Sequence, residues 1–400
     1  MLDRKGRDAT LPTCAVPPVE RAAAAWQTLP TEDPALAGGI LDINLKALVE
    51  NWRQIRDLHP NARTSAVVKA NAYGLGMIPV AEALWAEGCR TFFVALPHEG
   101  EELKKHLPRA EVFVLAGVPR GEAGYFHEHG LTPVLNTWEE VEEWAAYNAA
   151  RELRLPAAVH VDTGMNRLGL SPGEARRLSG HDNLLRNFRP CLLMSHLACA
   201  DTPGHEMNGR QKALFDEIRA LFPSVPTSLA NSAAAIAWPD WEYDLLRPGI
   251  ALYGGNPFSE RSNPMRAVAT LYATVLQVRE VRRGESVGYG ATWTAKDDSR
   301  IAIIGVGYAD GLFRRVAEGV AGPAHVFVAG QFAPYVGRIS MDLAAVDVSA
   351  IAPDVLERGM RVEVMGPHVS VDELACWAGT IAYEILTSLG PRFTRLYTSS

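Results

Sequence analysis

The 400-residue chain is 48% hydrophobic and 21% charged, which is ordinary for a globular protein and long enough for two domains. Its formal charge of −7 at pH 7 argues against a general nucleic-acid binder and against a polybasic membrane anchor. No apolar run approaches the roughly 20 residues of a membrane span, no signal peptide is recognisable, and the five cysteines form no CxxC pair. We therefore expect a cytoplasmic protein without a metal site.

Residues 1–38 are rich in proline, alanine and charge and show no sustained pattern, which predicts a partly disordered N-terminal extension. In residues 39–265, short apolar runs alternate with amphipathic helical stretches, and this alternation predicts a parallel sheet. Seven or so strands over about 225 residues fit a (β/α)8 barrel better than an open sheet. The predicted strands are Thr64–Val68, Thr91–Leu96, Val112–Ala116, Leu131–Leu135, Ala157–Val161, Cys191–Ser195 and Thr227–Leu229.

Residues 266–400 have a different residue pattern. Short β-rich segments separated by Gly, Pro and Asp predict a C-terminal all-β domain, and Val371–Leu389 is expected to be helical. The predicted fold is therefore α/β, a (β/α)8 barrel followed by an all-β domain.

Lys69 ends the apolar run that begins at Ala66 and precedes a turn punctuated by Gly74 and Gly76. The run is typical of a buried strand, so the lysine is expected at the C-terminal end of that strand, where α/β folds keep their active sites. A buried ammonium must be paired, deprotonated or used covalently, and a lysine with a lowered pKa can form a Schiff base. A structural ion pair or a snorkelling side chain is the alternative. The hydroxyl of Tyr73 could turn towards the same pocket.

Three further side chains follow predicted strands of the barrel. Arg167, in DTGMNRLG, could bind a carboxylate or phosphate or could be an ordinary surface arginine. His196 could face the site or only pack at the strand end. Ser232 could simply cap the helix that begins there, or it could seat a phosphate.

Two glycine-containing segments add candidates. In Arg247-Pro248-Gly249-Ile250, the glycine lets the backbone approach a ligand, and successive amides can hold a phosphate. Tyr289 has a glycine on each side, which indicates either a tightly turned loop that presents the phenol or a structural hairpin tyrosine. These candidates include a lysine, an arginine, a histidine and a phosphate seat on one barrel rim. Together they indicate an active site far more specifically than any one of them does.

Nine segments, in order, resemble the alanine racemases, which are fold-type III pyridoxal-phosphate enzymes. The resemblance runs from about Ile40 to Tyr397. It implies a (β/α)8 barrel, a β-domain and a head-to-tail homodimer with shared active sites. The segments are VVKANAYGLG, DTGMNRLG, SHLACAD, ANSAA, RPGIALYG, GYGATW, GYADG, GRISMD and YEILTSLG.

The resemblance implies interconversion of L-alanine and D-alanine through an aldimine of pyridoxal 5'-phosphate, supplying D-alanine for peptidoglycan. Lys69 would carry the cofactor and act as one base, and Tyr289 of the partner subunit would act as the other. A guanidinium at Arg247 would keep the pyridine nitrogen unprotonated, which weakens the electron sink and favours reprotonation. The implied cofactor-binding residues are Lys69, Tyr73, His196, Asn231, Ser232, Arg247, Gly249 and Ile250.

The resemblance also implies which residues bind the substrate and which line its access corridor. Arg167 would reach the substrate carboxylate, and Met341 and Asp342 would come from the partner subunit. The implied access corridor contains Asp201, Tyr308, Arg314 and Arg338.

Three positions depart from the family pattern. Where some members carry a carbamylated lysine that positions the substrate arginine, this chain has His160, so another group, such as a bound anion, must do so. The position aligned with a phosphate-contacting tyrosine is Pro391, and Ser228 stands where some members have histidine. A broad-specificity amino-acid racemase, another fold-type III enzyme such as a decarboxylase, and a non-catalytic cofactor carrier are the alternatives. The decarboxylases use a carboxylate at the ring nitrogen, and the carriers lack a β-domain.

Overall fold

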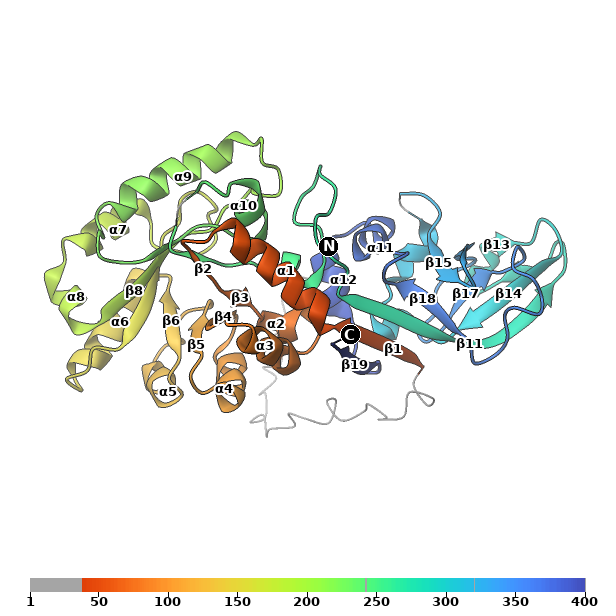
Figure 1. Cartoon of the computed structure of the whole chain (residues 1–400), viewed down its shortest axis with the longest axis horizontal. Coiled ribbons are helices and arrows are strands. Elements are labelled where there is room, and N and C mark those ends of the chain that lie inside the picture. Colours follow the sequence, from red (N-terminus) through yellow and green to blue (C-terminus); the bar gives the residue numbers. More distant parts are fainter. Residues whose placement is uncertain (1–37, 242, 320, 400) are drawn as a thin grey trace, which may run out of the picture.

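The computed structural model describes residues 38–241, 243–319 and 321–399. The N-terminal extension expected for residues 1–38 lies outside these ranges except for Gly38. Figure 1 shows two regions side by side, a ring of strands and helices and a strand-rich region, with helix α1 (Leu45–Leu58) running along the ring towards the strand-rich region.

Parallel strands form a closed barrel, as predicted. Seven of them pair in chain order. Closure comes from short β10, which pairs with β2, while the residues flanking β10 donate backbone hydrogen bonds to the β9 segment on the other side. Strands β2 and β3 are one strand interrupted at Ser65. The barrel strands are β2 (Arg63–Thr64), β3 (Ala66–Val67), β4 (Thr91–Val94), β5 (Glu111–Val114), β6 (Thr132–Leu135), β7 (Pro156–His160), β8 (Arg189–Met194), β9 (Thr227–Ser228) and β10 (Leu245–Leu246).

Helices cover the outside of the barrel (Figure 1). Their apolar sides join one continuous core that includes the barrel strands. Following α1, the helices are α2 (Lys69–Tyr73), α3 (Met77–Ala86), α4 (Pro97–His106), α5 (Ala123–Glu128), α6 (Trp138–Ala149), α7 (Pro172–Ser179), α8 (Asp182–Asn187), α9 (Glu206–Arg219), α10 (Ser232–Ala237) and the 3-10 turn η1 (Ile250–Tyr253).

The second region is built on the long strand β11 (Ala269–Val281), which pairs with several others in one sheet. Instead of one helix over Val371–Leu389, the chain forms α11 (Val371–Ala378) and α12 (Ala382–Ser388), separated by a left-handed residue, Gly379. The remaining elements are β12 (Ser286–Val287), η2 (Tyr289–Ala291), β13 (Trp293–Thr294), β14 (Ser299–Ile304), η3 (Tyr308–Asp310), η4 (Arg314–Glu318), β15 (His325–Val328), β16 (Gln331–Pro334), β17 (Ala344–Asp347), β18 (Arg361–Met365) and β19 (Thr394–Thr398).

The first described strand, β1 (Gly39–Asn44), belongs to this second sheet and not to the barrel. It pairs antiparallel with β11 and parallel with β19. The sequence-based boundary at residue 39 therefore put this segment in the wrong sheet. The reason is physical: a short apolar strand followed by a helix has the same pattern whether it opens a barrel or completes a neighbouring sheet.

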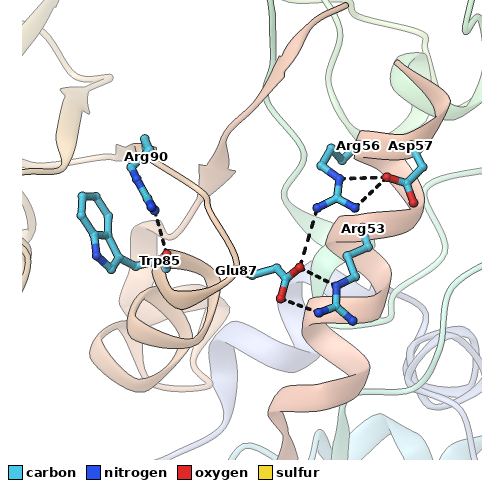
Figure 2. Close-up of polar contacts among 6 residues, drawn as sticks. All are labelled: Arg53, Arg56, Asp57, Trp85, Glu87 and Arg90. Atoms are coloured by element: carbon cyan, nitrogen blue, oxygen red, sulfur yellow. Dashed lines mark hydrogen bonds and ion pairs between the residues drawn. The ribbon is translucent and has the colours of Figure 1, made fainter. Parts of the chain in front are cut away.

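Charged side chains tie helix α1 to the end of α3 at the surface (Figure 2). Arg53 donates to Glu87 at 2.6 Å, and Arg56 lies 3.7 Å from the same carboxylate. Nearby, Arg90 stacks on the Trp85 ring and donates to its carbonyl at 2.7 Å. The hydrogen bond from Arg53 is the main cause that lowers the pKa of Glu87. Because the cluster is largely exposed, it adds little to the free energy of unfolding, and its main effect is to orient the two helices.

A half-buried carboxylate joins the two regions. Asp372, at the start of α11, accepts the backbone N–H of Asn256 at 3.0 Å and the side-chain amide of Asn263 at 2.9 Å. Both asparagines lie in the segment that leaves the barrel. Burial raises the pKa of Asp372, and these hydrogen bonds oppose that rise. Within the described residues, no helix is long and apolar enough to cross a membrane.

We expect Asp372→Ala to lower the free energy of unfolding by about 2 kcal/mol, because it leaves the two asparagine donors without their acceptor. Urea denaturation followed by tryptophan fluorescence measures the change. Asp354→Ala is the control, since Asp354 is exposed and forms no hydrogen bond with the described residues, and it should change the value by less than about 0.5 kcal/mol. Equal stabilities of the two variants would show that the Asp372 contacts contribute nothing.

Candidate functional site

A cavity of about 760 Å³ lies at the C-terminal ends of the barrel strands. Eight residues expected to bind a cofactor and one expected to bind a carboxylate all line it, although they come from segments spread over about 180 residues. They are Lys69, Tyr73, Arg167, His196, Asn231, Ser232, Arg247, Gly249 and Ile250. The structure thus brings together the barrel half of the predicted site.

Lys69 begins a turn with unusual backbone geometry. Residues 70–73 all have φ between 53° and 55°, so they form a left-handed turn without a glycine. Such a turn costs about 1–2 kcal/mol per residue and needs outside support. Glu99 supplies part of it by accepting the N–H of Ala70 at 2.7 Å. The turn brings the Tyr73 hydroxyl into the same cavity as the lysine amine.

The electrostatics of the cavity favour an uncharged amine at Lys69. Burial lowers the pKa of Lys69, and the nearby Arg167 cation lowers it further, while Glu99 opposes both. With Arg167 and Arg247, the wall carries three lysine or arginine side chains and one carboxylate, Glu384. The cavity therefore suits an anionic ligand, and its lysine is prepared to act as a nucleophile or a base.

The far end of the cavity offers hydroxyls and amides that fit a phosphate group. Ser232 accepts the N–H of Gly249 at 2.8 Å, which leaves its own O–H free to donate. The buried Tyr73 hydroxyl has no hydrogen-bond partner among the described residues, and burial raises its pKa, so it remains a donor. A Cβ at Gly249 would overlap that hydroxyl, so only glycine allows the approach. The helix cap expected at Ser232 is instead Asn231, which accepts the N–H of Ala234 at 3.0 Å.

Arg247 is held rigidly in the barrel floor. Its guanidinium donates to the Ser195 carbonyl at 2.5 Å and to the Ser228 hydroxyl, and it lies 3.5 Å from Nδ1 of His196. Ser228, which stands where some relatives have histidine, therefore supports this arginine. Burial lowers the pKa of Arg247 to about 9. Because this value is still above neutral pH, the guanidinium is cationic there. Burial and the Arg247 charge lower the pKa of His196, so its ring is neutral.

Arg167 lines the cavity and is an exposed residue. It forms no hydrogen bond or ion pair with any residue in the described ranges. Its loop is nevertheless rigid, because the Asp162 carboxylate accepts the N–H groups of Gly164 and Met165 at 2.9 Å each, and that of Asn166 as well. A cation on a rigid loop with unpaired donors can receive a carboxylate.

The wall that α12 and the preceding segment supply was not predicted from the sequence. Tyr383 lies with its ring centroid 5.9 Å from that of Tyr73, and Ile381, Glu384 and Thr387 line the cavity beside it. The expectation that Pro391 replaces a tyrosine here is wrong: Pro391 lines a different depression, and Tyr383 places a phenol in the cavity. The signal was present as the tyrosine of YEILTSLG, eight residues earlier than the position considered.

Three of the predicted residues lie in the β-rich region, away from the cavity of their own chain. Tyr289 is 74% exposed and Met341 is 53% exposed, although both are large apolar residues. Asp342 pairs with Arg392 at 2.8 Å. Figure 1 shows β13, which follows Tyr289, at the end of the molecule opposite the barrel. A single chain therefore does not bring Tyr289 to Lys69.

The residues expected to form an access corridor are also dispersed within one chain. Asp201 accepts the hydroxyl of Ser259 at 2.8 Å beside the barrel mouth. Tyr308 is exposed, Arg314 pairs with Glu318 at 3.2 Å, and Arg338 lines a second cavity together with Tyr289. Among the described residues, no group of three or more His, Cys, Asp or Glu side chains could hold a metal ion.

Comparisons with known proteins agree with this geometry. Residues 43–257 match the family "Alanine racemase, N-terminal domain", and residues 268–397 match "Alanine racemase, C-terminal domain". An alanine racemase of Methylobacterium sp. (strain 4-46) is 48% identical over 90% of this chain and 98% of its own. A catabolic alanine racemase of Mesorhizobium japonicum is 43% identical over 98% of this chain and 99% of its own.

A solved structure is similar over the same range. The crystal structure of alanine racemase from Bartonella henselae with covalently bound pyridoxal phosphate has a TM-score of 0.85 and 37% identity. The match covers 90% of this chain and 100% of that one. The hydroxyls, amides and lysine of the cavity are a donor set that fits such a cofactor.

Gly249→Ala should lower the affinity for pyridoxal 5'-phosphate at least tenfold, because the new Cβ displaces the Tyr73 hydroxyl from the phosphate seat. Spectroscopic titration of cofactor-free protein measures the affinity. Gly204→Ala is the control, since a Cβ there meets no atom within 4 Å. Tyr73→Phe tests the same seat without added bulk and should cost about tenfold. Wild-type affinity in both site variants would place the phosphate elsewhere.

Proposed function

The chain belongs to the alanine racemase family, and on that premise we propose that it interconverts L-alanine and D-alanine with Lys69 and with Tyr289 of the partner subunit. It is a pyridoxal-phosphate-dependent racemase, an isomerase. The observation that carries the proposal is the cavity in which a lysine of lowered pKa, a phosphate seat and an unpaired arginine face one another. Supply of D-alanine for peptidoglycan and a cytoplasmic location stay predictions of the sequence.

Residues at opposite ends of the cavity bind different parts of the cofactor and substrate. Ser232, Tyr73 and the amide of Ile250 anchor the phosphate at one end, and the Gly249 N–H, which was also expected to do so, donates to Ser232 instead. Arg167 receives the substrate carboxylate at the other. The bound cofactor withdraws electrons and so acidifies the substrate Cα–H. Arg247, held as a cation, keeps a proton off the pyridine nitrogen, so electron withdrawal is limited and return of the proton is favoured.

Two proton-transfer groups on opposite faces account for inversion. Lys69, whose pKa is lowered by burial, takes the Cα proton on one face or returns it there. A second group must act on the other face. The Tyr289 phenol is exposed far from its own chain's cavity, and it lines a surface cavity with Ser340, the residue before exposed Met341. Exposed apolar residues in such a group are typical of a surface that meets another protein.

A homodimer with shared sites follows from this arrangement. If the β-rich region of one subunit covers the barrel mouth of the other, Tyr289, Met341 and Asp342 reach a cavity whose own chain lacks them. A two-fold axis then completes two sites at once. Asp201, Tyr308, Arg314 and Arg338 would flank the resulting passage for alanine.

Incubation of the holoenzyme with L-alanine in D2O tests the reaction. We expect formation of D-alanine together with deuterium at Cα, because each inversion exchanges that hydrogen with a solvent-derived one. Chiral chromatography and proton NMR follow the two products. Release of carbon dioxide would instead indicate a decarboxylase, and absence of turnover would indicate a cofactor carrier. Turnover of other amino acids at rates similar to alanine would favour a broad-specificity racemase.

Mixed dimers test the shared site. Lys69→Ala and Tyr289→Ala chains should each be inactive, and dimers formed from one of each should regain up to half of the wild-type activity per dimer, since one of the two sites is then intact. Affinity tags of two kinds allow purification of the mixed dimer before the assay. Purified mixed dimers without activity would mean that both bases belong to one chain.

A further inference from the structure

The side-chain amide of Asn136 has only one orientation that satisfies its surroundings. Asn136 follows strand β6, and its Nδ2 lies 2.9 Å from the carbonyl oxygen of Val134 and 3.2 Å from that of Leu115. Carbonyl oxygens accept hydrogen bonds and cannot donate them, so the NH2 group must point to these two atoms. The amide oxygen, Oδ1, is therefore fixed on the side that faces His160.

This orientation fixes the proton on the buried imidazole of His160. Nδ1 of His160 lies 2.8 Å from Oδ1 of Asn136. Since Oδ1 can only accept, Nδ1 must carry the hydrogen. In the neutral ring, Nε2 then has a lone pair and no hydrogen. The chain of contacts from two backbone carbonyls to the ring thus selects one tautomer.

The neutral form of His160 is also the favoured one. Burial lowers the pKa of His160 to about 4, and the Arg247 and Arg167 cations contribute to the lowering, whereas Asp162 opposes it. The Asp162 carboxylate is already occupied by the amides of its own loop. At neutral pH the ring therefore offers an acceptor at Nε2, and that atom has no hydrogen-bond partner among the described residues.

The acceptor and an unpaired donor line the same cavity. His160 is the last residue of β7, and Arg167 lies on the loop that follows it. We propose that Nε2 of His160 accepts an N–H of Arg167 and so positions the guanidinium for the substrate carboxylate, without a bound anion. This inference rests on the proposed function, which makes Arg167 the carboxylate receptor. A neutral acceptor orients the arginine and leaves its full positive charge for the substrate, whereas an anion would offset part of it.

Two substitutions at His160 separate positioning from packing. His160→Leu removes both hydrogen bonds. His160→Gln can donate to Asn136 through its amide NH2 and accept from Arg167 through its amide oxygen, so it is the conservative variant. His127→Leu is the matched control, because His127 is an exposed residue of α5 outside the cavity, and its ring forms a hydrogen bond and a ring contact with Tyr147.

Propionate, which has the carboxylate of alanine but no amine, is the probe for Arg167. We expect His160→Leu to weaken propionate binding to the holoenzyme about tenfold and to raise the KM for alanine similarly, with kcat changed less than about threefold. His160→Gln should recover most of the affinity, and His127→Leu should match the wild type. Equal losses in the leucine and glutamine variants would indicate a packing role, and wild-type affinity in both would remove His160 from carboxylate binding; either result overturns the proposal.

The same propionate titration shows whether the His160 imidazole or a bound anion positions Arg167. Propionate affinity should be unchanged when chloride is replaced by isethionate at constant ionic strength. A loss of affinity that chloride restores would mean that an anion positions Arg167, which contradicts the proposal.

Nitrogen-15 NMR of histidine-labelled protein gives a readout that needs no turnover. The His160 signals, identified by their absence in His160→Gln, should show a protonated Nδ1 and an unprotonated Nε2 at pH 7. A protonated Nε2 would overturn the proposal. If the tautomer and the propionate results hold but alanine is not racemised, the proposed function fails while this inference stands.

Discussion

The left-handed turn that follows Lys69 is the constraint on which the site depends. Four consecutive residues without glycine adopt a backbone conformation that L-amino acids avoid, at about 1–2 kcal/mol each. Without this turn, Lys69 and Tyr73 would not share one cavity. Strain of this size persists only where the surrounding structure over-determines it.

That support comes from distant parts of the chain. Glu99 holds the first amide of the turn at 2.7 Å, and Arg395 donates to the Gly74 carbonyl at 3.0 Å just beyond it. Tyr397 donates to the Leu75 carbonyl at 3.0 Å, and Gly76 leaves room for that phenol. The C-terminal strand therefore fixes the lysine loop, so the β-rich region contributes to the site of its own chain as well as to that proposed for its partner.

Much of the site could be predicted because parallel strands in a barrel end on one rim. Lys69, Arg167, His196 and Arg247 each follow an apolar run, and the topology alone brings such residues together. Other parts gave no usable signal. Strand β10 has two residues, which are too few to show a strand pattern. An asparagine that follows a strand, such as Asn136, cannot be told from an ordinary turn residue. Tyr383 stands in the YEILTSLG segment that carries the family resemblance, but it was missed because nothing local shows that α12 returns to the barrel mouth.

The fold was predicted in outline for a similar reason. Alternation of strands and helices identifies a barrel, and a change to short β segments identifies a second region. The assignment of β1 could not be made from pattern, because pairing with β11 and β19 is decided by contacts more than 200 residues away in sequence. The same holds for the tautomer of His160, which depends on two carbonyl oxygens that no motif records.

The pairing of β1 with β19 has a consequence for biosynthesis. The barrel is in effect an insertion between β1 and β11, and β19, the other neighbour of β1 in the sheet, comes later still. On a ribosome that adds about 5–20 residues per second, β1 emerges tens of seconds before β19 exists. The barrel can close in that interval, but an apolar strand with an open edge must wait, and such an edge is prone to pair with other chains. Nascent chains of this protein should therefore be substrates for chaperones until β19 has been made.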